Sequence, residues 1–228
     1  MKRILVFTIS LLVTVGASAQ WDEEYRMEIG GGMGLVSYLG DFNGNLAAHQ
    51  QPMASLVAKR VFNPYMALAA NVSYGKLKGN AKDVTTFYPD FKDRLYTFSH
   101  PLIDVGLRYE YNFWAYGTGK DYRGARRLAP FVFVGLGATY ADTAQGGVLA
   151  MNLPMGAGIK YKATSRVNIV MDWAVHFSGS DKLDGVKDPY YIKSTGAFKN
   201  KDCYSTWQLT VTYSFMAKCR TCNNDRDD

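Results

Sequence analysis

Ser205-Thr-Trp-Gln-Leu-Thr-Val-Thr-Tyr-Ser-Phe215, near the C-terminus, alternates between apolar and polar residues from Trp207 to its end. A period of two is typical of a β-strand, because successive side chains point to opposite faces of the sheet. Here one face carries aromatic and aliphatic residues, and the other carries hydroxyl and amide groups. That division fits the wall of a membrane β-barrel, which has lipid outside and a polar interior.

The N-terminus has the pattern of a secretory signal peptide. Lys2 and Arg3 precede an apolar run, Ile4–Val15, and the small residues Ala17-Ser-Ala19 follow that run. A transmembrane helix is the competing interpretation, but the run is shorter than the roughly 20 apolar residues that span a bilayer. We therefore predict a signal peptide over residues 1–19 and export of the mature chain.

Seven further stretches show the same alternation, so eight strands are predicted. Each is about as long as, or longer than, the roughly 9–11 residues that a tilted strand needs to cross a bilayer. The predicted fold class is all-β: an eight-stranded antiparallel transmembrane β-barrel over residues 20–215, with a periplasmic tail over residues 216–228. Pro154, inside one stretch, is expected to disturb its ladder because proline donates no backbone hydrogen bond. The seven stretches are residues 27–37, 53–62, 66–75, 95–113, 130–140, 151–161 and 167–177.

The predicted connections alternate in length, as the topology of an outer-membrane barrel requires. Short turns at 63–64 and 162–165 and both mature termini are assigned to the periplasmic end. The segment 114–129 would also be periplasmic, although it is long and basic. The long outer connections are residues 40–52, 79–94, 141–150 and 178–204. The basic segment and the tail supply the predicted partner-binding residues Lys120, Arg123, Arg126, Arg127, Lys218 and Arg220.

A soluble sandwich or a lipocalin-like barrel would show similar local alternation, with its apolar faces inside. A membrane barrel is favoured because Tyr and Trp lie near strand ends and because Gly, Ser, Thr and Asn fill the opposite faces. The net charge is +6, or +4 (24 basic minus 20 acidic residues) without Lys2 and Arg3. This modest excess requires no nucleic acid, and the basic 114–129 segment fits an acidic protein or a phospholipid surface better.

Charged residues on the inward faces have two interpretations: a catalytic site, as in barrels with protease or lipid-modifying activity, or a structural ion network. We favour the network, because an eight-stranded barrel is filled by side chains and an unpaired buried charge is costly. None of His49, His100 and His176 has a Ser or a carboxylate at a spacing typical of a catalytic triad. No catalytic, cofactor-binding or metal-binding residue is predicted. The predicted network contains Asp104, Arg108, Glu110, Arg166 and Asp172, with Lys160 and His176 on the same faces.

The three cysteines lie in the last fifth of the sequence. Cys219 and Cys222 form a Cys-Arg-Thr-Cys motif in the tail, and a disulfide between them is predicted in the oxidising periplasm. Redox chemistry or half of a zinc site are the alternatives, although neither a second ligand pair nor a βαβ pattern accompanies the motif. Cys203, in the last long connection, has no fourth cysteine to pair with and is predicted to remain a thiol or to link to a partner.

Two stretches carry a family resemblance. Glu28-Ile-Gly-Gly-Gly-Met-Gly-Leu-Val-Ser-Tyr-Leu-Gly-Asp-Phe-Asn43 resembles the opening of the PorG family of Bacteroidota, and Arg108-Tyr-Glu-Tyr-Asn-Phe113 supports the resemblance. The resemblance extends over most of the mature chain. It implies a non-enzymatic outer-membrane component of the type IX protein secretion system, tied to a periplasmic ring of the lipoprotein PorK and its partner PorN. Segments 114–129 and 216–228 would then contact the ring, although no motif in the sequence names a partner.

The alternative function is that of a generic small barrel similar to OmpX or OmpW. Such a barrel would act through its extracellular loops in adhesion, in stress protection or in the passage of small hydrophobic molecules. The connection 178–204, which contains Tyr190, Tyr191 and several lysines, would be its binding loop.

Overall fold

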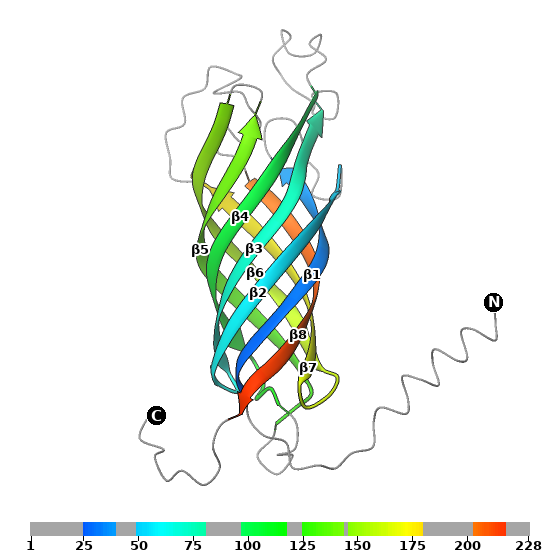
Figure 1. Ribbon diagram of the computed structural model, residues 1–228, viewed down its shortest axis with the longest axis vertical. Coiled ribbons are helices and arrows are strands. Elements are labelled where there is room, and N and C mark those ends of the chain that lie inside the picture. Colours follow the sequence, from blue (N-terminus) through cyan, green and yellow to red (C-terminus); the bar gives the residue numbers. More distant parts are fainter. Residues whose placement is uncertain are drawn as a thin grey trace, which may run out of the picture.

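The computed structural model describes residues 25–39, 49–80, 97–117, 125–143, 146–179 and 203–217. Eight antiparallel strands close into a barrel in which each strand pairs with the next and β8 pairs with β1 (Figure 1). The predicted eight-stranded barrel is therefore confirmed. The described segments contain no helix that is long and apolar enough to cross a membrane. The strands are β1 (Tyr25–Leu39), β2 (Gln51–Asn63), β3 (Met66–Asn80), β4 (Thr97–Asn112), β5 (Leu128–Thr143), β6 (Gly146–Lys162), β7 (Val167–Ser178) and β8 (Cys203–Ala217).

The two ends of the barrel differ in their connections. We call the end at which β1 begins and β8 finishes the turn end, and the opposite end the loop end. The turn end, at the bottom of Figure 1, carries the β2–β3 turn at 64–65, the β4–β5 connection and the β6–β7 turn at 163–166. The other four connections lie at the loop end.

Side-chain oxygens shape both turns at the turn end. The Asn63 Oδ1 atom accepts hydrogen bonds from the backbone N–H groups of Tyr65, at 2.9 Å, and of Met66, at 2.8 Å. In the β6–β7 turn, the Thr164 Oγ1 atom accepts a bond from the backbone N–H of Val167, at 3.0 Å. Asn and Thr favour turns because they can satisfy backbone donors locally in this way. The short connections therefore follow from the residues at these positions.

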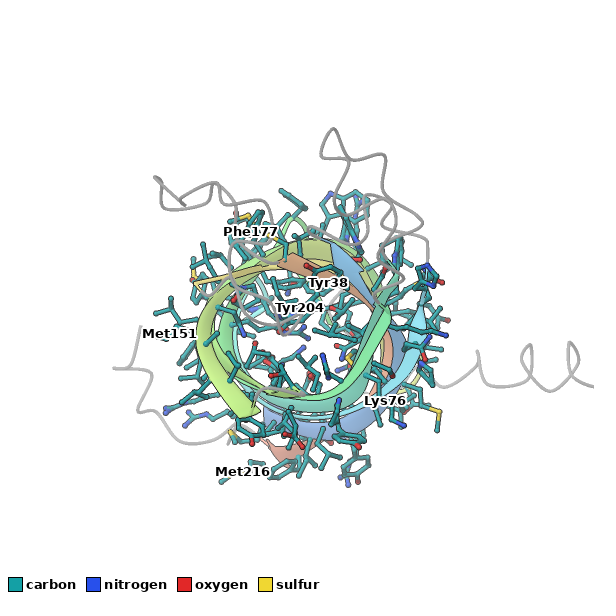
Figure 2. All side chains as sticks on the ribbon, turned by 90° about the horizontal axis from the view of Figure 1, so that it is seen from above. Tyr38, Lys76, Met151, Phe177, Tyr204 and Met216 are labelled. Carbon is teal, nitrogen blue, oxygen red and sulfur yellow. The ribbon has the colours of Figure 1, made fainter. Side chains whose placement is uncertain are left out.

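The two faces of the wall have the polarity that the alternation predicts. On β8, Leu209 is 55% exposed on the outside, whereas its neighbour Thr210 is 3% exposed on the inside. On the other strands the outside is likewise mostly aliphatic and aromatic, and the inside combines small and polar side chains with apolar ones such as Leu102, Phe131 and Phe133. In the view along the barrel, Tyr38 and Tyr204 point inward and Met151 points outward (Figure 2).

The predicted 141–150 and 178–204 connections are shorter than expected. β5 continues to Thr143 and β6 begins at Gly146, so most of the predicted 141–150 connection is strand. The Thr143 hydroxyl donates a 2.7 Å bond to the Gly146 carbonyl, and Gly146 has a φ of 123°, which permits a sharp reversal here. β8 begins at Cys203 rather than after Tyr204, because its first residues pair with the ends of β1 and β7.

Pro154 interrupts its ladder, as predicted. The β5–β6 pairing runs from Leu128 opposite Tyr161 to Val134 opposite Met155, and it resumes with Gly137 opposite Asn152. The gap falls at Leu153 and Pro154, because the proline nitrogen carries no hydrogen to donate, whereas on the other side of β6 Pro154 stays opposite His176.

Glycine on the inner face of β1 lets β8 approach closely. An added Cβ at Gly34 would overlap the backbone carbonyl of Trp207, and one at Gly30 would overlap that of Val211. Gly31, which lies between them, would gain only ordinary contacts at 3.5 and 3.6 Å. The closing seam of the barrel therefore requires glycine at particular positions.

Gly34→Ala is expected to lower the free energy of unfolding by about 1–3 kcal/mol, since the methyl group must displace the β8 backbone. Urea unfolding in lipid vesicles, followed by tryptophan fluorescence, measures this loss. Gly31→Ala is the matched control and should change stability far less. Equal losses in the two variants would contradict the close-approach explanation.

Candidate functional site

Glu110 on β4 lies at the centre of the barrel interior and contacts three cations. The Lys160 Nζ atom is 2.7 Å from the Glu110 Oε2 atom, and the Lys59 Nζ atom is 2.8 Å from it. The Arg108 Nε atom donates to Oε1 at 3.1 Å. The Glu110 side chain is fully buried. One carboxylate therefore holds together cations from β2, β4 and β6.

The charged contacts extend to both sides of Glu110. The Arg108 Nη1 atom donates to both carboxylate oxygens of Asp172 at 3.3 Å. The Lys59 Nζ atom is also 3.9 Å from the Glu28 Oε2 atom, which accepts a 3.1 Å bond from the Thr212 hydroxyl. These contacts link β1, β2, β4, β6, β7 and β8 across the interior.

This central ion cluster is neutral, with three cations opposite three carboxylates. Neutrality matters because a buried charge without a partner is costly. Two aromatic rings from β5 complete the cluster: the Arg108 guanidinium carbon lies 4.8 Å from the Phe133 ring centre, and the Lys160 Nζ atom lies 4.4 Å from that of Phe131. The members of the cluster are Glu28, Lys59, Arg108, Glu110, Lys160 and Asp172.

A second polar cluster surrounds Asp104, nearer the loop end. The Asp104 Oδ2 atom accepts hydrogen bonds from the hydroxyls of Tyr204, at 2.8 Å, and Thr139, at 2.9 Å, and from the Asn152 amide. His176 stacks on Tyr204 with ring centres 4.3 Å apart. An apolar layer covers this cluster on its loop-end side. Its buried side chains are Val36, Tyr38, Met53, Leu77, Leu102, Ala141, Ala150 and Tyr204.

The Asp104 cluster contains the nearest approach to a catalytic arrangement in the described interior. The His176 Nε2 atom is 3.4 Å from the Thr206 hydroxyl, and its Nδ1 atom is 4.0 Å from the Asp104 Oδ2 atom. All three side chains are buried. The arrangement contains an acid, a base and a hydroxyl, but all three are buried away from any substrate. Among the described residues, no group of three His, Cys, Asp or Glu is suited to a metal ion.

Tyr116, in the β4–β5 connection, closes the turn end of the interior. Its hydroxyl donates a 2.9 Å bond to the Asn168 Oδ1 atom, and its backbone N–H donates a 3.0 Å bond to the Pro64 carbonyl. The ammonium groups of Lys160 and Lys162 lie 6.0 and 5.6 Å from the centre of its ring. Burial raises the pKa of the Tyr116 phenol above its ordinary value. We call this arrangement the Tyr116 plug.

A small cavity lies between the Tyr116 plug and the central ion cluster. Its volume is about 20 Å³, and Glu28, Lys59, Lys160 and Tyr116 contribute to its lining. A polar cavity of this size holds about one water molecule. The interior at this level is therefore filled by side chains and leaves no room for a substrate.

The described parts of the β4–β5 connection are ordered around the plug. The backbone N–H of Arg126 donates a 2.7 Å bond to the Ala115 carbonyl, and that of Gly117 donates a 3.1 Å bond to the Arg126 carbonyl. The Arg126 guanidinium carbon lies 4.7 Å from the Trp114 ring centre. Arg126 and Arg127 are exposed at the turn end. Part of the segment predicted to bind partners thus also closes the barrel.

The predicted ion network is divided differently in the structure. Arg108, Glu110 and Asp172 belong to the central ion cluster, whereas Asp104 belongs to the separate cluster near the loop end. The expectation that Arg166 faces the interior is wrong. Arg166 lies in the β6–β7 turn, and its guanidinium donates 2.9 Å bonds to the hydroxyls of Tyr25 and Tyr213 on the outside.

Sequence reasoning missed Lys59 as a cluster member. Lys59 and Arg60 are adjacent, so their charges gave no indication of which one faces inward. It also missed Tyr116, because nothing in a connection segment marks a residue that returns into the barrel. The remaining predicted residues, Lys120, Arg123, Lys218, Arg220, Cys219 and Cys222, lie outside the described residues, as does the predicted signal peptide.

A family model described as a domain of unknown function (DUF6089) matches residues 2–224. Among solved structures, the chain is similar to Neisserial surface protein A, with 13% identity, a TM-score of 0.50 and coverage of 83% of this chain and 97% of that one. The OprG outer-membrane protein of Pseudomonas aeruginosa gives 10% identity, a TM-score of 0.49 and coverage of 86% and 98%. No curated protein matches. The similarity to the Neisserial protein shows a shared fold, that of an eight-stranded outer-membrane barrel.

Proposed function

The chain belongs to the family described as a domain of unknown function (DUF6089), and we propose that it is a non-enzymatic outer-membrane component of the type IX protein secretion system. In this role it links the outer membrane to a periplasmic ring of the PorK and PorN type. The observation that carries the proposal is the resemblance of Glu28–Asn43 to the opening of the PorG family.

The outer surface supports placement in a membrane. Large apolar side chains such as Met33 (79% exposed) and Leu136 (64% exposed) cover the outside of the strands. A patch of this extent on a water-soluble protein would drive association, whereas lipid covers it in a barrel. Outer-membrane barrels place their short turns in the periplasm, so the turn end and both mature termini are assigned there.

The filled interior supports a role other than conduction. The central ion cluster, the apolar layer at the loop end and the Tyr116 plug occupy the barrel along its axis. An exported protein could not pass through this interior. The barrel would instead hold a position in the membrane and present its turn end to a partner.

The partner surface proposed here is basic. Arg126 and Arg127 are exposed beside the Tyr116 plug, and Lys120, Arg123, Lys218 and Arg220 belong to the same segment and to the tail. Deleting 114–129 would remove Tyr116 together with the basic residues and would confuse loss of contact with loss of fold. Substitution of the six basic residues by glutamine is the cleaner test.

The tagged wild-type protein, purified from gently solubilised outer membranes, is expected to retain ring lipoproteins of the PorK and PorN type. The six-residue glutamine variant should lose them, because the contact depends on positive charge. Mass spectrometry of the purified material measures both results. Arg60→Gln/Arg166→Gln is a control for position, since it removes turn-end charge outside the proposed contact surface, and it should retain the ring.

A solitary barrel, reproducible after crosslinking, would contradict the secretion role. It would favour the generic small barrel that acts through its outer loops. Recovery of the ring with the glutamine variant would leave the secretion role standing and would show that the contact lies elsewhere on the protein.

A further inference from the structure

The outer wall at the turn end carries two arginines on one side of the barrel. Arg166 precedes β7, and its guanidinium reaches Tyr213 on β8 and Tyr25 on β1. Arg60 on β2 pairs directly with Met27 on β1. Because β7, β8, β1 and β2 are consecutive around the barrel, both arginines lie on one continuous surface. We call this surface the turn-end patch; it comprises Tyr25, Met27, Arg60, Phe62, Arg166 and Tyr213.

Aromatic rings hold both guanidinium groups at the edge of the apolar wall. The Arg166 guanidinium carbon lies 5.3 Å from the Tyr25 ring centre, and that of Arg60 lies 5.6 Å from the Phe62 ring centre. Phe62 and Tyr213 are 53% and 45% exposed on the outside. Aromatic side chains at this position of a membrane barrel mark the interface between hydrocarbon and headgroups. In the membrane placement proposed above, the two cations would lie at the level of the lipid phosphates.

Among the residues that the structure describes, the exposed charges at this end are all positive. Of the five carboxylates in the described residues, only Asp142 is exposed, and it lies near the loop end of β5. In the described part of the turn end, five arginines are exposed: Arg26, Arg60, Arg126, Arg127 and Arg166. Exposed Arg60 and Arg166 thus have no exposed described carboxylate beside them at the turn end to neutralise their charge.

The Arg166 side chain is oriented so that it can donate hydrogen bonds to an anion. A guanidinium has five N–H donors in a fixed planar arrangement, and the bonds to the two tyrosine hydroxyls use the Nε and Nη1 atoms. Those bonds also raise the pKa of Arg166 above its ordinary value. The side chain is thereby fixed in direction while other N–H groups remain to meet phosphate oxygens.

We propose that the turn-end patch binds the phosphate groups of anionic phospholipids, with the acyl chains along the apolar wall and the phosphates against Arg60 and Arg166. This inference rests on the membrane placement proposed above and is independent of the secretion role. It makes the patch a lipid site, separate from the basic partner surface of the β4–β5 connection and the tail.

The test is a titration of the full-length protein in dodecylmaltoside with dioleoylphosphatidylglycerol or dioleoylphosphatidylcholine, with bound lipids counted by native mass spectrometry. Wild type should prefer the anionic lipid. Arg60→Gln/Arg166→Gln should reduce that preference by roughly 25-fold, at about five-fold for each arginine. Arg126→Gln/Arg127→Gln removes the same charge at the same end and should keep it.

A second variant leaves the charge unchanged. Tyr25→Phe/Tyr213→Phe removes only the hydroxyls that direct Arg166, and it should weaken the preference for the anionic lipid by a few-fold. The proposal would be overturned by equal affinity of wild type for the two lipids, by equal losses in the two arginine variants, or by displacement of the lipid by an equal concentration of inorganic phosphate. If Arg60→Gln/Arg166→Gln lost a co-purifying protein but bound lipid as wild type does, the proposal would also be overturned, and the patch would be a protein-binding surface.

Discussion

Glu110→Gln is expected to lower the free energy of unfolding by about 3–5 kcal/mol, the range for breaking a buried ion pair by removing one partner. The substitution preserves the shape of the side chain but leaves Lys59, Arg108 and Lys160 opposite only two carboxylates. The three cations come from three strands, so the loss acts on the whole barrel. Urea unfolding in lipid vesicles, followed by tryptophan fluorescence, measures it.

Lys160→Met provides the matched comparison. Alone it leaves the central ion cluster with one excess negative charge and should also be destabilising. Combined with Glu110→Gln it restores two cations opposite two carboxylates, so the double variant should be more stable than the sum of the single losses implies. Strictly additive losses would contradict charge balance as the source of the effect.

Leu107→Arg is expected to cost about 2–4 kcal/mol of stability in the bilayer, the range for arginine on the lipid face near the midplane of a barrel. Leu107 is 54% exposed on β4 and pairs with Ala70 and Leu136, which face outward beside it. The charge would have to enter hydrocarbon or distort the bilayer. The same vesicle unfolding measurement gives the cost.

Leu128→Arg is the control for depth. Leu128 is 47% exposed and is the first residue of β5, at the turn end. The same chemical change there should cost only about 0–1 kcal/mol, because headgroups and water are within reach. Equal costs at the two positions would contradict the membrane placement of this wall.

The strands and their faces could be predicted because alternation reports directly on a two-sided wall. From Trp207 to Phe215 every residue falls on the face that its polarity indicates, and Pro154 interrupts its ladder as its chemistry requires. These are local properties, set by neighbouring residues along one strand. The strands could therefore be predicted from the sequence, and most of their ends to within a few residues.

Features that depend on three-dimensional closure could not be predicted. Arg166 was assigned to the interior by continuing the β7 alternation one residue too far, into a turn where the Thr164 hydroxyl redirects the backbone. Tyr116 enters the barrel through contacts with Pro64 and Asn168, which are distant in sequence. The division of the charges into two clusters likewise depends on the tilt and pairing of all eight strands.

The central ion cluster also bears on how the barrel assembles. Its members come from β1, β2, β4, β6 and β7, so they meet only after most of the chain has been inserted. A slip of one residue in the pairing of β4 would turn Arg108 and Glu110 towards lipid and leave their partners inside without them. Misregistered or incomplete barrels thus carry an uncompensated charge that the closed one does not. The cluster therefore penalises wrong pairings of these strands, and the closed barrel is the arrangement in which all six charges find partners.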